Sequence, residues 1–384
     1  MRIAVLFPSF LGGGAEAVCA WILETLKDRD VTLVTLSDTS LKDLDVQYGT
    51  NLGDSKVRVH VVRLPLPRAL GEKVIKSLSG FSFRQFYLSW YYRKFLSKRF
   101  NLAISAFNEM DLGLPGIQYI HLPVFAQGHE ALRPMVGHPE SSLRRAYKRA
   151  LKIVTGWSEK RLRNNVTVTN SQWTARWIEK IWGFQARVVY PPVVWSMEVR
   201  PWDQRENGFV LISRIVREKK IEKAIKILND VRFFGYDLHL RILGGIVDIS
   251  YFRELQQRFG SYDWIIWEKR LTRSEYERIL SNYKYGIHVR DNEQFGIGVA
   301  EMMRAGVIPF VPVQGGQAEI VGHDNRLCWD NEADAAEKIV KVLNSPRLQE
   351  ELRSKLSMLS QGFSVENFVT AFKQVVDEFG IAHV

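Results

Sequence analysis

The segment from Asp291 to Gly316 reads DNEQFGIGVAEMMRAGVIPFVPVQGG, and its pattern predicts how the second half of the chain folds. The apolar runs at 285–289 and 307–311 are expected to be buried strands, and the residues at 299–305 are expected to form a helix between them. A Gly-Gly turn closes the segment. This order of strand, turn, helix and strand predicts a parallel, doubly wound sheet.

Two glutamates and a Phe-Gly-Ile sequence make the turn before this helix a candidate ligand site. Glu293 precedes Phe295, Gly296 and Ile297, and Glu301 lies about one turn inside the helix. Doubly wound sheets bind ligands at the carboxyl ends of their strands, and unpaired amides at a helix start favour phosphate or hydroxyl oxygens. A carboxylate at Glu301 can hold a sugar diol through two hydrogen bonds. The alternative is a surface acid followed by an ordinary helix.

Length and composition indicate two domains and a basic surface. The chain has 384 residues, of which 46% are hydrophobic, and a formal net charge of +11. These values suit two cores of ordinary size and an anionic partner. Only Cys19 and Cys328 occur, so no disulfide framework is expected and a reducing compartment fits. The sequence opens on a strand without a leader pattern, and no apolar run reaches about 18 residues, so no membrane-spanning helix is expected.

The first residues predict the opening of another Rossmann-like domain. A strand over 2–7 leads into the turn 11–14, LGGG, and a helix follows over 15–27. The glycines let the backbone approach a ligand that a Cβ would block, and a plain tight turn is the alternative. The turn is neither a GxGxxG fingerprint nor a P-loop, which argues against NAD and ATP. Two Asp-x-Asp triplets, at 28–30 and 43–45, are interpreted as solvated charge, so no metal is expected.

Two basic segments predict contact with an anionic membrane surface. Segment 81–100 has nine aromatic and five Lys or Arg residues and no acid, and segment 141–164 has eight Lys or Arg residues and one acid. Rings can lie at the headgroup level while cations bind lipid phosphates. The alternative is core packing with a solvated basic face. Nucleic acid would also explain the charge, but no RNA-binding signature accompanies the aromatic residues, so no nucleic-acid partner is expected.

Three further side chains lie where predicted strands end. His121 follows a strand over 117–120 and precedes a proline, and a neutral imidazole there can donate or accept a hydrogen bond. A structural histidine is the alternative. Arg214 leaves a strand over 209–212, and Lys219 follows five residues later. Two cations over one turn can neutralise a departing diphosphate, although a charged surface loop is the alternative.

These segments together resemble the family 4 glycosyltransferases, which are retaining enzymes of the GT-B architecture. Glu293 and Glu301 resemble the Glu-x7-Glu signature of that family, and the wording NEQFGIGVAEMMRAG is most similar to lipid-linked mannosyltransferases that extend the dolichol-bound glycan on the cytosolic face. Other matching segments are GGAE from Gly13, QYIHLP ending at Pro123, VTNSQWTARWI from Val168, VVYPPV from Val188, and AEIV from Ala318.

The resemblance implies roles for individual residues. In that family the first glutamate reaches the donor sugar, the second holds the nucleotide ribose, and an Arg-x4-Lys pair clamps the donor diphosphate. Lys220 stands where the family usually has glycine, which is expected to shift this turn, and the nucleotide base is expected near 268–271. The candidate catalytic residues are Arg214, Lys219, Glu293 and His121, and the candidate donor-binding residues are Gly13, Gly14, Phe295, Gly296, Ile297 and Glu301.

The expected fold class is α/β of the GT-B type, with two Rossmann-like doubly wound domains facing across a cleft. Residues 1–192 are expected to form the acceptor domain, 193–207 the linker and 208–364 the nucleotide-sugar-binding domain. A C-terminal helix within 365–384 is expected to cross back onto the first domain.

The implied function is metal-independent transfer of a hexose, with retention, from a nucleotide sugar to a glycan or lipid-linked acceptor. Mannose is the favoured sugar, and GDP-mannose is favoured over UDP-sugars as donor, with no cofactor. The expected location is cytoplasmic, at the cytosolic face of a membrane through peripheral contact. Two alternatives remain open: a soluble transferase acting on a small sugar or polysaccharide, and a catalytically silent nucleotide-sugar-binding subunit. No covalent nucleophile is assigned.

Overall fold

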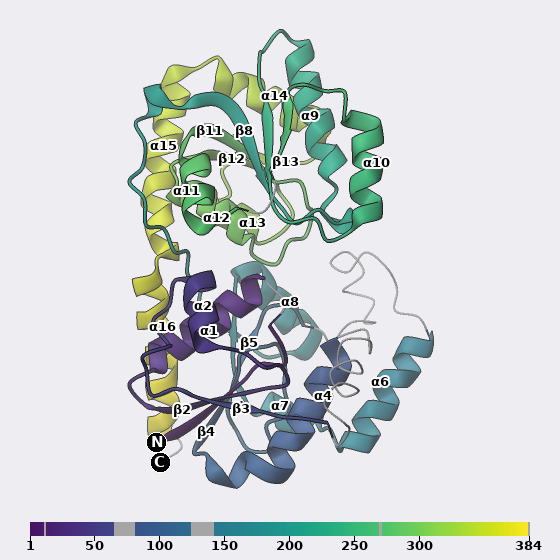
Figure 1. Ribbon diagram of the computed structural model, residues 1–384, viewed down its shortest axis with the longest axis vertical. Coiled ribbons are helices and arrows are strands. Elements are labelled where there is room, and N and C mark those ends of the chain that lie inside the picture. Colours follow the sequence, from purple (N-terminus) through teal and green to yellow (C-terminus); the bar gives the residue numbers. More distant parts are fainter. Residues whose placement is uncertain (11–12, 65–80, 124–141, 269–270, 383–384) are drawn as a thin grey trace. The chain divides into compact units, whose positions relative to one another are not determined.

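The computed structural model describes residues 1–10, 13–64, 81–123, 142–268 and 271–382. The chain divides into two compact units, Met1–Pro192 with Val365–Val384, and Val193–Ser364. Each unit contains a parallel sheet with helices packed on it, so the prediction of two Rossmann-like doubly wound domains is confirmed (Figure 1). Residues 193–207, expected as the linker, belong to the second unit.

The first unit contains a seven-stranded sheet in the order β3-β2-β1-β4-β5-β6-β7. Every neighbouring pair is parallel, and the central strands are buried, as expected for a sheet covered on both faces. The terminal helix α16 packs against α1 in this unit. The strands are β1 Arg2–Leu6, β2 Asp30–Thr35, β3 Arg58–Val61, β4 Leu102–Ser105, β5 Ile117–Ile120, β6 Val166–Thr169 and β7 Arg187–Val188, and the helices are α1 Gly14–Leu26, α2 Leu41–Tyr48, α4 Phe81–Tyr91, α6 Ser142–Thr155, α7 Glu159–Arg163, α8 Gln172–Trp182 and α16 Val365–Ala382.

The second unit contains a six-stranded parallel sheet in the order β10-β9-β8-β11-β12-β13. The strand expected at 285–289 begins two residues earlier, because the buried Tyr283 pairs with the start of β8. The strands are β8 Glu206–Ile212, β9 Leu240–Leu243, β10 Ile265–Trp267, β11 Tyr283–Ile287, β12 Ile308–Pro312 and β13 Cys328–Trp329, and the helices are α9 Ile221–Phe233, α10 Ile249–Phe259, α11 Arg273–Ser281, α12 Ile297–Arg304, α13 Gln317–Ile320, α14 Glu332–Leu343 and α15 Pro346–Ser360.

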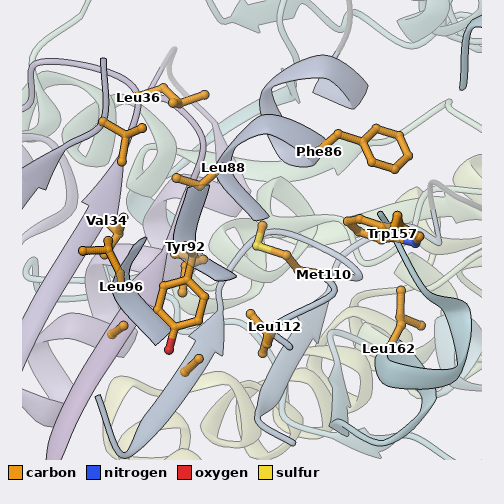
Figure 2. Packing of buried hydrophobic residues seen from close by; sticks show 14 residues of the cluster. Val34, Leu36, Phe86, Leu88, Tyr92, Leu96, Met110, Leu112, Trp157 and Leu162 are labelled. Carbon is orange, nitrogen blue, oxygen red and sulfur yellow. The ribbon is translucent and has the colours of Figure 1, made fainter. Parts of the chain in front are cut away.

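The aromatic segment 81–100 contributes mainly to the core of the first unit. After α4 the chain continues as a π-helical turn, Tyr92–Leu96, and a 3₁₀ turn, Ser97–Arg99. Phe86, Leu88 and Tyr92 are buried in one apolar cluster together with residues of β4, β2 and the loop before α7 (Figure 2). The interpretation of this segment as a headgroup-layer helix is therefore wrong for these side chains, because composition alone did not show which face packs inward.

None of the helices in the described ranges has the length and apolar character needed to cross a bilayer.

Lys220 has a backbone conformation that favours the glycine expected at this position. Lys220 has φ 49° and ψ 48°, in the left-handed region that costs a residue with a Cβ about 1–2 kcal/mol. Its ammonium lies 3.2 Å from Asp291, in an ion pair that is half exposed on the lysine side. Surface pairs of this kind contribute about 0–1 kcal/mol, so the ion pair offsets only part of the backbone cost.

We predict that Lys220→Gly leaves the free energy of unfolding equal to that of the parent or raises it by up to about 1 kcal/mol, because glycine adopts this backbone freely. Lys226→Gly is the matched control, since Lys226 is an exposed lysine inside α9. The free energy of unfolding of this control is expected to fall by about 1 kcal/mol. Urea unfolding of both variants measures the difference, and equal losses would contradict the strain argument.

Candidate functional site

The strand order of the second unit has a switch point between β8 and β11. From β8 the chain proceeds outward through β9 and β10, and from β11 it proceeds the other way through β12 and β13. Lys219 follows the carboxyl end of β8, and Glu293 follows the carboxyl end of β11. Parallel α/β sheets bind ligands at such a point, because the loops diverge there and leave a crevice.

An ion pair joins these two loops. Lys219 Nζ lies 2.5 Å from Glu293 Oε2, and the two side chains are 18% and 12% exposed. Arg290 approaches both oxygens of the same carboxylate, at 3.3 and 3.4 Å, and His288 Nε2 lies 3.8 Å from Oε2. The sequence-predicted residues Lys219 and Glu293 are thus brought together, whereas Arg290 and His288 were missed.

The charges around Glu293 keep it ionised. Burial alone would raise the pKa of Glu293, but the positive charges of Lys219 and Arg290 outweigh burial and lower this pKa to about 2. Burial also lowers the pKa of His288 to about 4, so His288 is neutral at neutral pH. Glu293 can therefore accept hydrogen bonds from hydroxyl groups but cannot donate a proton.

Glycines let the loops at this edge of the sheet approach one another closely. A Cβ on Gly316 would lie 2.2 Å from the carbonyl oxygen of Gln294, and Gly315 pairs with Glu293 in an isolated parallel bridge. A Cβ on Gly244 would lie 2.1 Å from the carbonyl oxygen of Ser213. The exposed Arg214 follows Ser213 directly, so the loop after β9 lies against the loop that carries Arg214.

The Phe-Gly-Ile sequence forms the start of α12, two residues earlier than expected. Gly296 precedes the helix with φ 100°, which favours glycine, and Val299 N–H makes the first backbone bond back to Gly296 O at 2.8 Å. Phe295 is 3% exposed and its ring packs 5.7 Å from Phe363. Phe295 is therefore a core side chain, and only its backbone and the amides of Gly296 and Ile297 remain as candidate donor contacts.

The second glutamate is held by α11. Glu301 Oε1 accepts from Arg273 at 2.8 Å, and Oε2 accepts from the Tyr276 hydroxyl at 2.7 Å. The Glu301 side chain is 14% exposed. The capping box of Thr272 and Glu275 predicts that a helix starts here. No sequence pattern shows that the first turn of this helix lies against α12.

The expected base site lies partly outside the described residues, since 269–270 are not among them. Glu268 accepts from Arg241 at 2.6 Å, and its backbone N–H bonds to Ile242.

The remaining candidates lie in the first unit. His121 follows β5, and its Nε2 lies 3.1 Å from the carbonyl oxygen of Ala106, which can only accept. The neutral ring therefore carries its proton on Nε2 and leaves Nδ1 as an acceptor. Burial lowers the pKa of His121 to about 4.

Gly13 precedes α1 with an extended backbone, and Gly14 is the first residue of α1 and exposed; the turn residues 11–12 lie outside the described ranges.

A Cβ placed on Gly13 would have no neighbouring atom of the ligand-free molecule within 4 Å. The glycine is thus not required by packing within the described residues. Those residues also contain no group of three or more His, Cys, Asp or Glu side chains that is arranged to hold a metal ion.

We predict that Lys219→Met lowers the free energy of unfolding by about 1–3 kcal/mol at about pH 7, because the Glu293 carboxylate loses its nearest charged partner. The folded-state pKa of Glu293 lies below its ordinary 4.5, so its contribution is present above that value and is lost as pH falls towards about 2. The difference between parent and variant should therefore shrink at about pH 3.

Denaturant unfolding at the two pH values tests this prediction. Lys226→Met, with the same change in charge at an exposed position of α9, is the control and should change stability little. A loss for Lys219→Met that does not depend on pH would contradict the ion-pair argument.

Residues 196–357 match the family described as Glycosyl transferases group 1. The GDP-Man:Man(3)GlcNAc(2)-PP-Dol alpha-1,2-mannosyltransferase of Dictyostelium discoideum is 27% identical over 241 residues, covering 56% of this chain and 47% of that protein. The Homo sapiens protein of the same name is 26% identical over 239 residues, covering 56% and 49%. The chain thus spans about half the length of these relatives.

Solved structures show the same fold at low sequence identity. Anabaena Alr3699/HepE, crystallised with UDP and glucose, superposes with a TM-score of 0.68 at 16% identity, covering 98% of this chain and 99% of that chain. WaaG, a glycosyltransferase involved in lipopolysaccharide biosynthesis, superposes with a TM-score of 0.64 at 12% identity, covering 96% and 98%. The chain therefore has the GT-B fold, and its residues 196–357 are similar to the family described as Glycosyl transferases group 1.

Proposed function

We propose that this chain is a retaining hexosyltransferase that transfers mannose from GDP-mannose to a lipid-linked glycan. The observation that carries this proposal is the Lys219–Glu293 pair at the switch point of a group 1 glycosyltransferase domain, with Arg214 on the same loop as Lys219 and Glu301 on the following helix. The names of the relatives favour GDP-mannose as the donor and a lipid-linked glycan as the acceptor.

Each candidate side chain has a chemical task in this proposal. Lys219 and Arg214 neutralise the diphosphate as it departs, which is the electrostatic part of catalysis, and no metal ion is needed if they do so. Glu293 accepts hydrogen bonds from donor-sugar hydroxyls, since it remains ionised. Glu301 takes the ribose, and the amides of Gly296 and Ile297 face the phosphates or sugar at the start of α12. In the first unit, His121 Nδ1 is the acceptor for a hydrogen bond from a sugar hydroxyl.

A donor panel tests the reaction. Purified protein is incubated with GDP-mannose, GDP-glucose, UDP-glucose or UDP-GlcNAc and a prenyl-diphosphate oligosaccharide, and nucleotide release and glycan mass are measured. GDP release with a mass gain of one hexose is expected. Transfer only to water-soluble saccharides would favour the soluble alternative, and donor binding without turnover would favour the silent subunit.

We predict that Arg214→Ala lowers turnover about ten- to a hundredfold, since a charge-assisted hydrogen bond contributes roughly 1.5–3 kcal/mol. Arg217→Ala is the matched control, because Arg217 is an exposed neighbour paired with Glu254 at 2.7 Å. The control should remain near the parent. Turnover of Arg214→Ala within about twofold of the parent would remove Arg214 from the site.

The exposed apolar side chains of helix α6 support the proposal that the acceptor is bound to a membrane. Leu143, Tyr147 and Val154 share one face, because they are spaced four and seven residues apart, and Leu143 and Val154 are 83% and 79% exposed. Ile153, beside this face, is 80% exposed. The opposite face carries Lys148, which is buried. The helix therefore presents apolar side chains outward.

Exposed cations lie on the side of the helix turned away from these apolar residues. Arg145 and Arg149 are exposed on the same helix, and the whole chain carries +11. An amphipathic helix of this kind lies in the headgroup layer, and each Lys or Arg near an anionic surface contributes about 1 kcal/mol. We therefore propose peripheral contact with an anionic membrane, at the cytosolic face, through α6 rather than through the buried part of segment 81–100.

We predict that changing Leu143, Ile153 and Val154 together to Gln reduces binding to vesicles of phosphatidylcholine with phosphatidylserine about tenfold or more, because the apolar contact area is removed. Val46→Gln with Leu114→Gln is the control, since both residues are exposed apolar side chains of the same unit. Sedimentation with vesicles measures binding, and an unchanged triple variant would exclude α6 as the contact.

A further inference from the structure

The side chain of Arg273 links the carboxylate of Glu301, the residue expected to bind the ribose, to two other segments of the second unit. Its Nη1 donates to Glu301 at 2.8 Å, while its Nε donates to Glu277 at 2.7 Å and its Nη2 to the carbonyl oxygen of Val194 at 2.5 Å. Three groups on three different segments therefore fix the plane of one guanidinium.

The partners of Arg273 are themselves fixed. Glu277 is 1% exposed, and its other oxygen accepts from the hydroxyl of Ser196 at 2.6 Å. Tyr276 donates to the second oxygen of Glu301, and burial together with the Glu301 carboxylate raises the pKa of Tyr276 well above its ordinary value. The Tyr276 hydroxyl therefore stays protonated and can act only as the donor in this contact.

The Glu301 carboxylate retains acceptor capacity despite these two bonds. Each carboxylate oxygen can accept two hydrogen bonds, and one position on each oxygen is taken, by Arg273 and by Tyr276. Two acceptor positions, one per oxygen, remain in an orientation that the protein has already fixed. A vicinal diol offers two O–H donors at a spacing that suits the two oxygens of one carboxylate.

We propose that Arg273 and Tyr276 are positioning residues that present Glu301 to the 2′- and 3′-hydroxyls of the donor ribose, so that discrimination between ribo- and deoxyribonucleotides depends on them. This inference rests on the proposed nucleotide-sugar donor. Because the ribose does not change during the transfer, the contact strengthens donor binding in the ground and transition states alike. Loss of the contact therefore raises KM for the donor and leaves kcat near the parent value.

The test compares the affinities of GDP and 2′-deoxy-GDP by calorimetry, and those of UDP and 2′-deoxy-UDP in parallel. In the parent, the deoxynucleotide should bind at least about tenfold more weakly, as expected for loss of a hydrogen bond to a charged group. In Arg273→Gln and in Tyr276→Phe, the ratio of the two dissociation constants should fall to about threefold or less, mainly through weaker binding of the ribonucleotide.

One control variant and one comparison between variants keep this test interpretable. Arg278→Gln makes the same change in charge at an exposed position of α11 and should retain the parent ratio. Tyr276→Phe leaves the Arg273–Glu277 pair intact, so it remains informative if Arg273→Gln fails to fold because the buried Glu277 has lost its partner.

The outcomes separate this inference from the proposed function. Variants that keep the full ribose preference, or that lose affinity for both nucleotides by the same factor, would overturn the positioning role while leaving the donor class intact. A parent that binds GDP or UDP without preferring the ribose form would do the same. A parent that binds neither nucleotide would overturn the proposed donor class and this inference with it.

Discussion

The ion pair between Lys219 and Glu293 is the contact on which the second unit depends at its switch point. It joins the loop after β8 to the loop after β11, and these strands are neighbours from which the chain departs in opposite directions. Removing two charges from water is unfavourable, and the mutual attraction offsets this cost only when further polar contacts complete the site. Arg290 supplies such contacts, so the carboxylate remains ionised although it is largely buried.

Much of this arrangement could be predicted from the order of motifs in the sequence. The strand, turn and helix around Glu293 follow from apolar periodicity, and two acids eight positions apart must lie near the same helix start. The parallel sheet then places Lys219 close to Glu293, because both follow neighbouring strands. Strand boundaries were less predictable, since Tyr283 pairs with the start of β8 and so extends β11 beyond the apolar run at 285–289.

Contacts between distant segments could not be predicted in the same way. Arg273 and Tyr276 lie 28 and 25 positions before Glu301, and the capping box that starts α11 gives no direction for its side chains. Segment 81–100 and helix α6 show the same limit. Both are basic in sequence, yet one buries Phe86 and Tyr92 while the other leaves Leu143 and Val154 in solvent. Which face packs inward depends on the neighbouring elements, and composition does not contain that information.

Lys219, which pairs with Glu293, and Arg273, which pairs with Glu301, differ in how firmly the protein holds them. Lys219 carries a flexible ammonium that pairs with Glu293, so an arriving diphosphate can compete for this ammonium and change the environment of that carboxylate. Arg273 is instead fixed by Glu277 and Val194 as well as by Glu301, so its position should not change when a nucleotide arrives. A fixed acceptor lowers the ordering cost of binding, whereas an exchangeable ion pair allows charge to move towards the leaving group. The ribose end of the proposed site is thus suited to recognition, and the diphosphate end is suited to respond to the reaction.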